Sequence, residues 1–126
     1  MGYVRRILDD ELDRILPHLP AIAIEGARGV GKTATARQRA RTTHLLDDPL
    51  TRDALAADPR RILSEPIPVL IDEWQLMPAI WDVVRRAVDD GAPSGSFLLT
   101  GSAEYRGDRL HTGAGRIVDL RMRTMT

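Results

Sequence analysis

The sequence predicts an α/β fold in which parallel strands lie buried between helices, and three stretches support this prediction. Residues 21–24 form a short apolar run rich in Ile, as a strand buried on both faces requires. A glycine-rich turn and a run of strong helix formers over 34–41 follow this run. A second apolar run, 69–71, ends in two carboxylates, and apolar residues recur at helical spacing over 78–90. We therefore expect strands that alternate with helices.

Residues 3–18 are expected to form an N-terminal segment that is extended over 3–6 and helical afterwards. The acidic triplet 9–11 falls in the first turn of this helix, where it complements the helix dipole. Pro17 ends the helix. Because the dipole explains the acids, a metal site there is the weaker interpretation.

The middle of the chain is predicted to contain a strand over 43–47 and two short helices, 49–57 and 59–64. Each helix follows an Asp-Pro pair, so Asp48 and Asp58 are the expected N-caps, with proline at the first helical position.

The second half of the chain is expected to contain an amphipathic helix over 78–90 and strands over 96–100 and 117–122. Gly91 is the expected stop of the helix. Trp81 lies on its apolar face, which favours a place in the core over stacking on a nucleotide.

A glycine-rich motif between the first strand and its helix matches the pattern G-x-x-x-x-G-K-[ST] from Gly26 to Thr33. Its glycines allow the backbone to wrap around an anion, and amide N–H groups and the positive end of the next helix then face that anion. Lys32, the only lysine of the chain, would reach the β- and γ-phosphates, and the Thr33 hydroxyl would ligate Mg²⁺. The cofactor-binding residues expected from this motif are Gly26, Ala27, Arg28, Gly29, Val30, Gly31, Lys32, Thr33 and Ala34.

Asp72 and Glu73 follow the apolar run 69–71 directly. In an open parallel sheet, ligands bind beyond the carboxyl ends of the strands, which is where this pair falls. Asp72 would hold Mg²⁺ together with Thr33, and Glu73 would orient and polarise an attacking water. Taken alone, such a pair is equally well explained as a strand-end turn with solvated acids. Its position downstream of a complete phosphate-loop motif favours the catalytic interpretation.

Small hydroxyl side chains, Thr100 and Ser102, lie at the end of the strand predicted over 96–100. At the same edge as the carboxylates, either one could hydrogen-bond the γ-phosphate or the attacking water. A turn that happens to contain hydroxyl groups explains them equally well.

Composition is that of one globular domain of 126 residues, with 43% hydrophobic and 29% charged residues. Eighteen basic residues offset eighteen acidic ones, which provides no electrostatic argument for nucleic acid or a membrane as an obligatory partner. The sequence has no cysteine, no signal-peptide pattern and no membrane-length apolar run, so we expect a cytoplasmic location. The three histidines lack metal-ligand spacing and are interpreted as structural or surface residues.

These motifs resemble those of the AAA+ superfamily of P-loop ATPases, and more narrowly a prokaryotic branch of predicted AAA+ ATPases that carry an uncharacterised C-terminal domain. Four blocks support the resemblance in the family's order, namely 19–33, 70–75, 98–103 and 113–117. The resemblance covers essentially the whole chain. It implies a three-layer sandwich with helices on both faces of a five-stranded parallel sheet, in the order 5-1-4-3-2.

The same resemblance implies roles for the polar residues. It assigns Lys32 and Thr33 to ATP and Mg²⁺, Asp72 to Mg²⁺, and Glu73 to water activation.

It also suggests Thr100 or Ser102 in place of the asparagine that many members use as first sensor. Arg116 would be an arginine finger, with Arg109 as second choice, although a surface arginine with local hydrogen bonds is the simpler interpretation of either.

The whole chain, 1–126, is therefore expected to be a single AAA+-like ATP-binding core. It stops after the fifth predicted strand, without lid helices or a second sensor arginine. We expect a truncated member, or one that relies on self-association or a partner chain for these groups, with weak ATP hydrolysis in isolation.

The leading functional hypothesis is a Mg²⁺-dependent ATP-binding domain that hydrolyses the β–γ bond, which would make it an ATPase. One alternative is a nucleotide-gated interaction module, or a remnant without turnover. A P-loop phosphotransferase is less well supported, because no segment is dedicated to an acceptor pocket.

Overall fold

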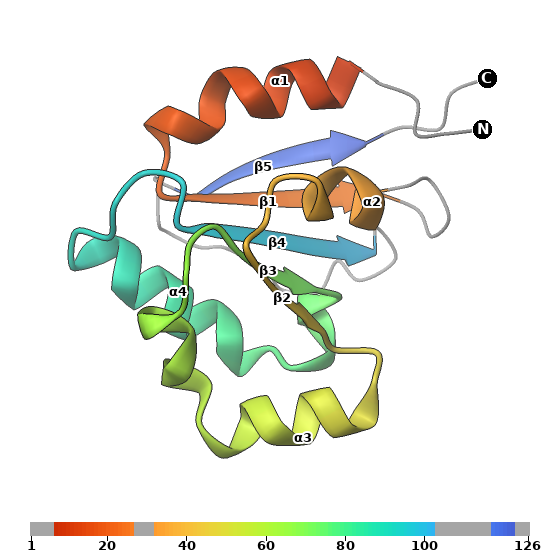
Figure 1. Cartoon of the computed structure of the whole chain (residues 1–126), viewed down its shortest axis with the longest axis vertical. Helices are drawn as coiled ribbons and strands as arrows, with labels where there is room; N and C mark the ends of the chain where they lie inside the picture. The colour runs from red at the N-terminus through yellow and green to blue at the C-terminus, as the bar shows by residue number, and fades with distance from the viewer. Residues whose placement is uncertain (1–6, 27–31, 103–116, 123–126) are drawn as a thin grey trace.

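A parallel β-sheet organises the chain, and the computed structural model describes residues 7–26, 32–102 and 117–122. The strands are β1 (Ala21–Gly26), β2 (Thr42–Leu45), β3 (Val69–Asp72), β4 (Phe97–Ser102) and β5 (Ile117–Met122). They lie in the order β2-β3-β4-β1-β5, and every neighbouring pair is parallel. The α/β architecture and the order β1-β4-β3-β2 agree with the sequence prediction, and Figure 1 shows the strands side by side, all running in one direction.

Helices connect the strands. The α-helices are α1 (Ile7–Ile15), α2 (Lys32–Arg37), α3 (Pro49–Ala57) and α4 (Ala79–Asp89), and the 3₁₀ helices are η1 (Leu16–His18), η2 (Pro59–Ser64) and η3 (Trp74–Leu76). Gly91 ends α4 with a positive φ of 95°, as expected of a glycine stop. The extended segment expected over 3–6 lies outside the described residues.

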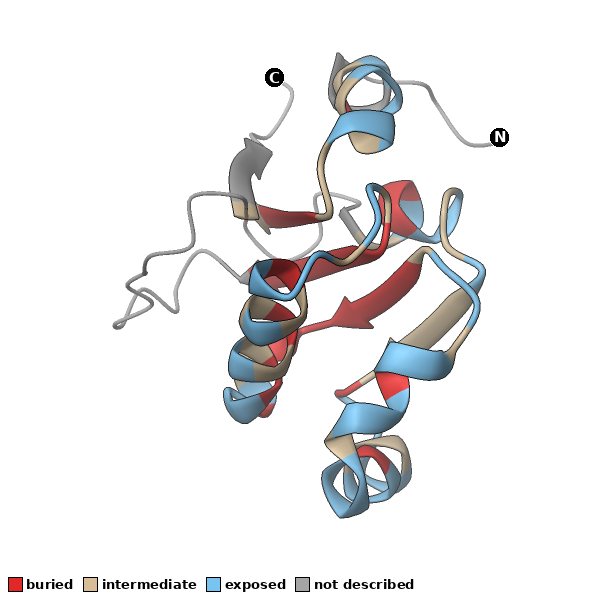
Figure 2. Ribbon diagram, turned by 90° about the vertical axis from the view of Figure 1, so that its left-hand side faces the viewer, coloured by how far each residue is buried: buried red, intermediate tan, exposed pale blue. Residues whose placement is uncertain are grey.

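The sheet separates two apolar clusters, because successive side chains of a strand point to opposite faces. On one face, Ile22 and Ile24 of β1 pack with Leu70, Leu98 and residues of α1 and α2. On the other face, Ala21 and Ala23 belong to the cluster that contains the buried residues of α3, η2 and α4. Figure 2 shows this layering as buried strands with exposed outer helix surfaces. The sheet is thus covered on both faces, as all-parallel sheets require.

Trp81 belongs partly to the second cluster, as its helical spacing predicts. Trp81 is half-buried and packs against the core. Its ring centroid lies 4.8 Å from that of Trp74, and the two ring planes are inclined by 40°. The described contacts therefore place Trp81 with the core.

In the structure α2 ends at Arg37, so it is shorter at its C-terminal end than the helix predicted over 34–41. The chain then tightens into i→i−3 hydrogen bonds, from Arg39 N to Ala36 O at 3.0 Å and from Ala40 N to Arg37 O at 3.3 Å. The Arg39 guanidinium donates to the Thr35 carbonyl at 2.9 Å and to Asp13 of α1 at 2.9 Å. These bonds satisfy an end carbonyl of α2 and connect α2 to α1.

The two Asp-Pro pairs behave differently. Asp48 caps α3, accepting a hydrogen bond from the Leu50 amide at 3.0 Å, as predicted. Asp58 makes no side-chain cap, and the segment that follows, η2, is a 3₁₀ helix. Asp58 therefore occupies the predicted N-cap position, with Pro59 at the start of η2, but its side chain does not make the expected capping bond. The Asp58 N–H bonds Leu55 O at 3.0 Å and closes α3.

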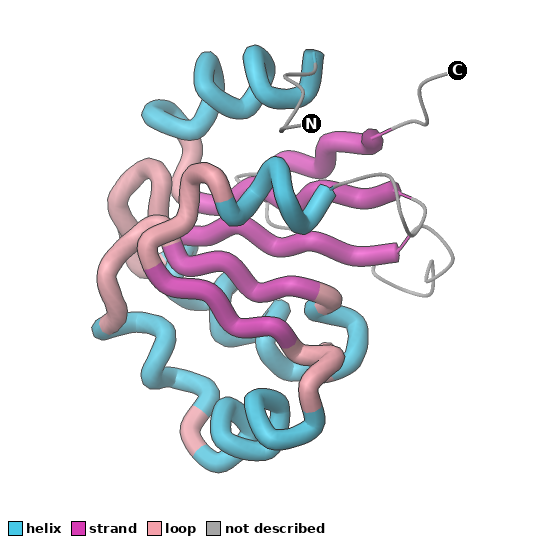
Figure 3. The backbone as a smooth tube through the Cα atoms, turned by 45° about the vertical axis from the view of Figure 1, so that its right-hand side comes forward, coloured by secondary structure: helices cyan, strands magenta, loops and turns pink. Residues whose placement is uncertain are grey.

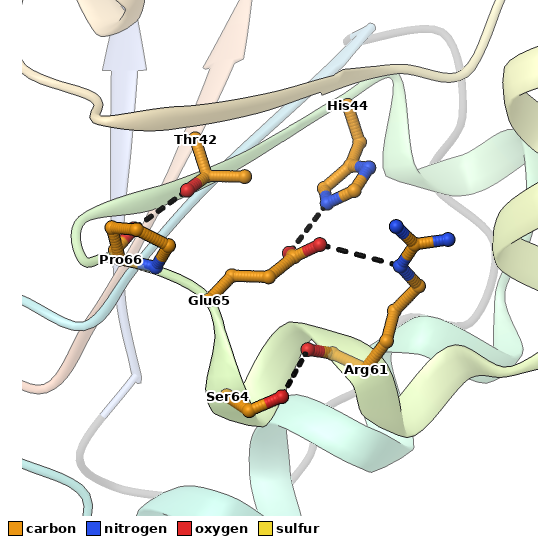
Figure 4. Close-up of polar contacts among 6 residues, drawn as sticks. All are labelled: Thr42, His44, Arg61, Ser64, Glu65 and Pro66. Carbon is orange, nitrogen blue, oxygen red and sulfur yellow. Dashed lines mark hydrogen bonds and ion pairs between the residues drawn. The ribbon is translucent and has the colours of Figure 1, made fainter.

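Beside β2, a polar cluster connects this edge strand to η2 (Figure 4). It is called here the edge cluster and consists of Thr42, His44, Arg61, Glu65 and Pro66. His44 Nε2 lies 2.7 Å from Glu65 Oε1, and Arg61 Nε lies 3.3 Å from Glu65 Oε2. Thr42 donates its hydroxyl hydrogen to the Pro66 carbonyl at 2.7 Å. His44 thus has a structural role, as the sequence analysis expected of the histidines, whereas His111 lies outside the described residues.

Candidate functional site

Polar side chains from three segments meet where β3 and β4 end and α2 begins. The strands are parallel, so their carboxyl ends lie at one edge of the sheet, on the side to which the arrows point in Figure 1. The register pairs Asp72 of β3 with Thr100 of β4, and Thr100 in turn with Ile24 of β1. Figure 3 shows α2 lying over this part of the sheet.

Strand periodicity explains why these side chains face α2. Asp72 is two residues after Leu70, and Thr100 is two residues after Leu98, so each shares the face of its apolar neighbour. Both leucines belong to the cluster that includes Ala36 of α2. The apolar packing that holds α2 against the sheet therefore also brings Thr33 over the strand ends.

Asp72 is the centre of the resulting hydrogen-bond network. Its Oδ1 accepts from the Thr33 hydroxyl at 2.6 Å and from the Thr100 hydroxyl at 2.6 Å. Asp72 is 5% exposed, and Thr100 is completely buried. Two hydroxyl donors thus fix the carboxylate between α2 and β4.

The Thr100 hydroxyl has two partners in the structure. It donates its hydrogen to Asp72 and accepts from the Glu73 backbone N–H at 3.1 Å. A hydroxyl has one hydrogen, so in this arrangement Thr100 cannot also donate to a phosphate. In this geometry Thr100 connects β4 to both carboxylate residues, and its sensor role stays a prediction. Ser102 is the last residue of β4.

Glu73 lies just beyond β3, in the left-handed backbone region at φ 60° and ψ 51°. This conformation is unfavourable for a residue with a side chain. Two hydrogen bonds hold it, the amide bond to Thr100 and one from Leu76 N to Glu73 O at 3.0 Å. Glu73 is 8% exposed, and its Oε1 accepts from Gln75 Nε2 at 2.6 Å.

Gly101 gives this turn the space it needs. A Cβ at position 101 would lie 2.9 Å from Trp74 Nε1, closer than Cβ atoms normally approach, and 3.1 Å from Gln75 Oε1, a tight contact. The absence of a side chain at residue 101 thus lets β4 pass close to η3 without displacing the Trp74 indole.

Thr33 and Asp72 offer a hydroxyl and a carboxylate oxygen, the hard donors that Mg²⁺ prefers. Among the described residues, no group of three His, Cys, Asp or Glu side chains could hold a metal ion. A magnesium ion here would therefore depend on phosphate and water oxygens for its remaining ligands, as is usual for magnesium in phosphoryl-transfer sites.

The other predicted site residues fall in three places. Gly26 is the buried last residue of β1, Lys32 is the first residue of α2, and Ala34 is exposed on α2. The loop residues Ala27, Arg28, Gly29, Val30 and Gly31 lie outside the described residues. So do both arginine-finger candidates, Arg109 and Arg116.

With this geometry in hand, comparison with known proteins identifies the family. A family model described as an AAA domain matches residues 18–126. The chain belongs to the AAA domain family. A search of curated proteins found no match.

Membership of the AAA domain family confirms the resemblance to AAA+ P-loop ATPases and supports nucleotide binding. The parallel α/β sheet is consistent with this class. In the part of the chain that the structure describes, no helix has both the length and the apolar character needed to cross a membrane.

Two residues of the AAA domain site were not singled out from the sequence, Gln75 and Gly101. Gln75 belongs to one of the blocks that support the family resemblance, and a polar side chain two residues after Glu73 was the available signal. Gly101 separates two hydroxyl residues and resembles an ordinary turn glycine. Only the close approach of β4 to η3 shows why a side chain would not fit there.

Proposed function

We propose that this AAA domain binds ATP with Mg²⁺ at the edge formed by β1, β3, β4 and α2, and hydrolyses the β–γ bond. The observation that carries this proposal is the 2.6 Å hydrogen bond between the Thr33 hydroxyl and Asp72 Oδ1. These residues are 39 positions apart in the sequence. Thr33 is the last residue of the phosphate-loop motif, and Asp72 is the first carboxylate at the end of the apolar strand β3. Family membership supports the nucleotide as the ligand.

The residues present fit magnesium by their chemistry. Thr33 and Asp72 would hold it together with phosphate oxygens, and bound there it would neutralise charge on the β- and γ-phosphates. Lys32, at the start of α2, would add a positive charge beside the same phosphates.

Hydrolysis requires water to attack the γ-phosphorus while the bridging bond to the β-phosphate breaks, releasing ADP and inorganic phosphate. Glu73 is the candidate to orient this water and accept its proton, since it follows Asp72 directly at the strand edge. Its buried, hydrogen-bonded carboxylate suits a group that must keep one orientation.

Binding is tested by titrating the full chain with a fluorescent ATP analogue, with Mg²⁺ and with EDTA. Wild type is compared with Lys32→Ala. We expect Lys32→Ala to weaken binding by about 10- to 100-fold, the usual effect of losing a charge-assisted hydrogen bond. EDTA should also weaken binding to wild type.

Arg37→Ala is the matched control, because Arg37 is an exposed cation at the other end of the same helix. It should bind like wild type. Equal binding by wild type and Lys32→Ala would contradict the proposal. Binding with no release of phosphate would instead favour a nucleotide-gated interaction module.

A further inference from the structure

The side chain of Gln75 lies beside that of Glu73 at the end of β3. Gln75 Nε2 donates to Glu73 Oε1 at 2.6 Å, although only Trp74 separates the two residues. Adjacent side chains of a strand point in opposite directions, and side chains two apart would be about 7 Å from each other. The left-handed backbone of Glu73 makes the contact, because it turns the chain into η3 immediately after β3.

The orientation of the Gln75 amide is determined by its partner. A carboxylate only accepts hydrogen bonds, so the NH₂ group must face Glu73 and the carbonyl oxygen must point away. That oxygen, Oε1, is buried and has no hydrogen-bond partner among the described residues. A buried acceptor without a partner destabilises the fold by an amount similar to what a hydrogen bond to a charged group contributes. The Gln75 side-chain amide therefore adds little net stability to the fold. A contribution to stability does not explain why an amide is found at this position.

The surroundings restrict the Gln75 side chain on its other side. A methyl group at position 101 would lie 2.9 Å from Trp74 Nε1, which would have to shift, and 3.1 Å from Gln75 Oε1, a tight contact. Trp74 is in turn packed against Trp81 of α4. The amide is thus confined between β4 and Glu73.

We propose that Gln75 is a positioning residue, whose side-chain amide holds the Glu73 carboxylate in the orientation that directs the attacking water. This inference rests on the proposed function, since it assigns Gln75 a part in the same hydrolysis. Gln75 acts only through Glu73 and is not itself assigned a contact with ATP.

Turnover and affinity separate this role from a structural one. Gln75→Met keeps the length of the side chain, removes the donor and removes the unpartnered acceptor. We expect phosphate release at saturating Mg·ATP to fall by about 10- to 100-fold, the range that misplacement of a reacting group causes. The affinity for the fluorescent ATP analogue and the thermal unfolding midpoint should stay close to those of wild type.

Gln38→Met is the matched control, because Gln38 is exposed after α2 and lies in no part of the site. It should have wild-type turnover. If Gln75→Met also turns over ATP like wild type, the inference fails while the proposed function stands. If wild type neither hydrolyses ATP nor binds it in a Lys32-dependent way, the proposed function itself has failed.

A second measurement tests the contact without any turnover. The sequence has no asparagine and only two glutamines, Gln38 and Gln75, so a ¹H–¹⁵N spectrum contains two pairs of side-chain amide signals, one pair from each NH₂ group. We expect the Gln75 signals to be shifted from those of exposed Gln38, to exchange slowly with water, and to move in Glu73→Ala. Coincident signals that do not respond to Glu73→Ala would overturn the inference, whatever the turnover of Gln75→Met.

Discussion

Two polar clusters of this sheet use the same kinds of side chain but differ in how completely their hydrogen bonds are satisfied. In the edge cluster beside β2, each oxygen of Glu65 has its own partner, His44 on one side and Arg61 on the other. At the carboxyl edge of β3 and β4, two hydroxyls converge on one oxygen of Asp72. Nearby, the buried Gln75 oxygen has no partner among the described residues.

This difference indicates different roles. In the edge cluster both oxygens of Glu65 have partners, which suits a stabilising network between β2 and η2. The polar residues at the ends of β3 and β4, called here the strand-end cluster, are Thr33, Asp72, Glu73, Gln75 and Thr100. In this cluster Glu73 has an unfavourable backbone conformation, and the buried Gln75 Oε1 has no partner among the described residues. Strain and unsatisfied groups gather at functional sites, where the surrounding fold holds them in place. We therefore expect changes in the strand-end cluster to affect activity more than stability, and changes in the edge cluster to do the opposite.

The largest expected effect comes from Glu73→Gln. Glutamine can still accept from Gln75 but is a poor base, so phosphate release should fall by about 10²–10⁴-fold. Binding of the fluorescent ATP analogue and the midpoint of urea unfolding should change little. A loss of stability without loss of turnover would reverse the comparison, because Glu73 would then behave like Glu65.

Thr100→Val tests the one strand-end residue expected to matter for both properties. Valine has nearly the same shape but leaves the buried Glu73 N–H without an acceptor, which should cost about 1–3 kcal/mol in urea unfolding. Turnover per folded molecule should fall as well, because Asp72 and Glu73 lose a common support.

Thr42→Val is the control for Thr100→Val. Its hydroxyl makes a single exposed bond to the Pro66 carbonyl, so the change should cost less than about 1 kcal/mol and leave turnover unchanged. If both threonine variants lost the same free energy of unfolding, the buried Thr100 network would stabilise the fold no more than one exposed hydrogen bond does.

Glu65→Gln tests the edge cluster. Removing the carboxylate weakens the bonds to His44 and Arg61, and we expect a cost of roughly 1–2 kcal/mol because these side chains keep some exposure to water. The free energy of urea unfolding measures this cost. Nucleotide affinity should match wild type, and a large drop in affinity would show that the two clusters are coupled.

The smallest expected effect comes from Asp48→Ala, which removes the N-cap of α3 outside both clusters. The loss should be about 1 kcal/mol, as is typical for an N-cap, with turnover unchanged. Chemical denaturation of this variant gives the scale of one exposed cap bond. An effect as large as that of Thr100→Val would show that stability does not distinguish buried networks from local caps in this fold.

Much of the fold could be predicted from the sequence, because apolar periodicity and strand-end chemistry are local. The runs 21–24 and 69–71 are strands, and parallel strands bring their carboxyl ends to one edge, so the meeting of Thr33 with Asp72 followed from motif positions alone. The length of α2 could not be predicted in this way, since the helix formers continue past its end at Arg37, where Arg39 bonds Asp13 and the Thr35 carbonyl.

What the sequence by itself determined about this protein is its class, its family and the segments that carry the site, because each depends on residue types at short, regular spacings. The tertiary structure alone decided how the polar side chains share their hydrogen bonds. Thr100 turns its hydroxyl to Asp72 because the register of β3 and β4 sets them side by side. Gln75 reaches Glu73 because the backbone takes a left-handed turn that no pattern in the sequence marks.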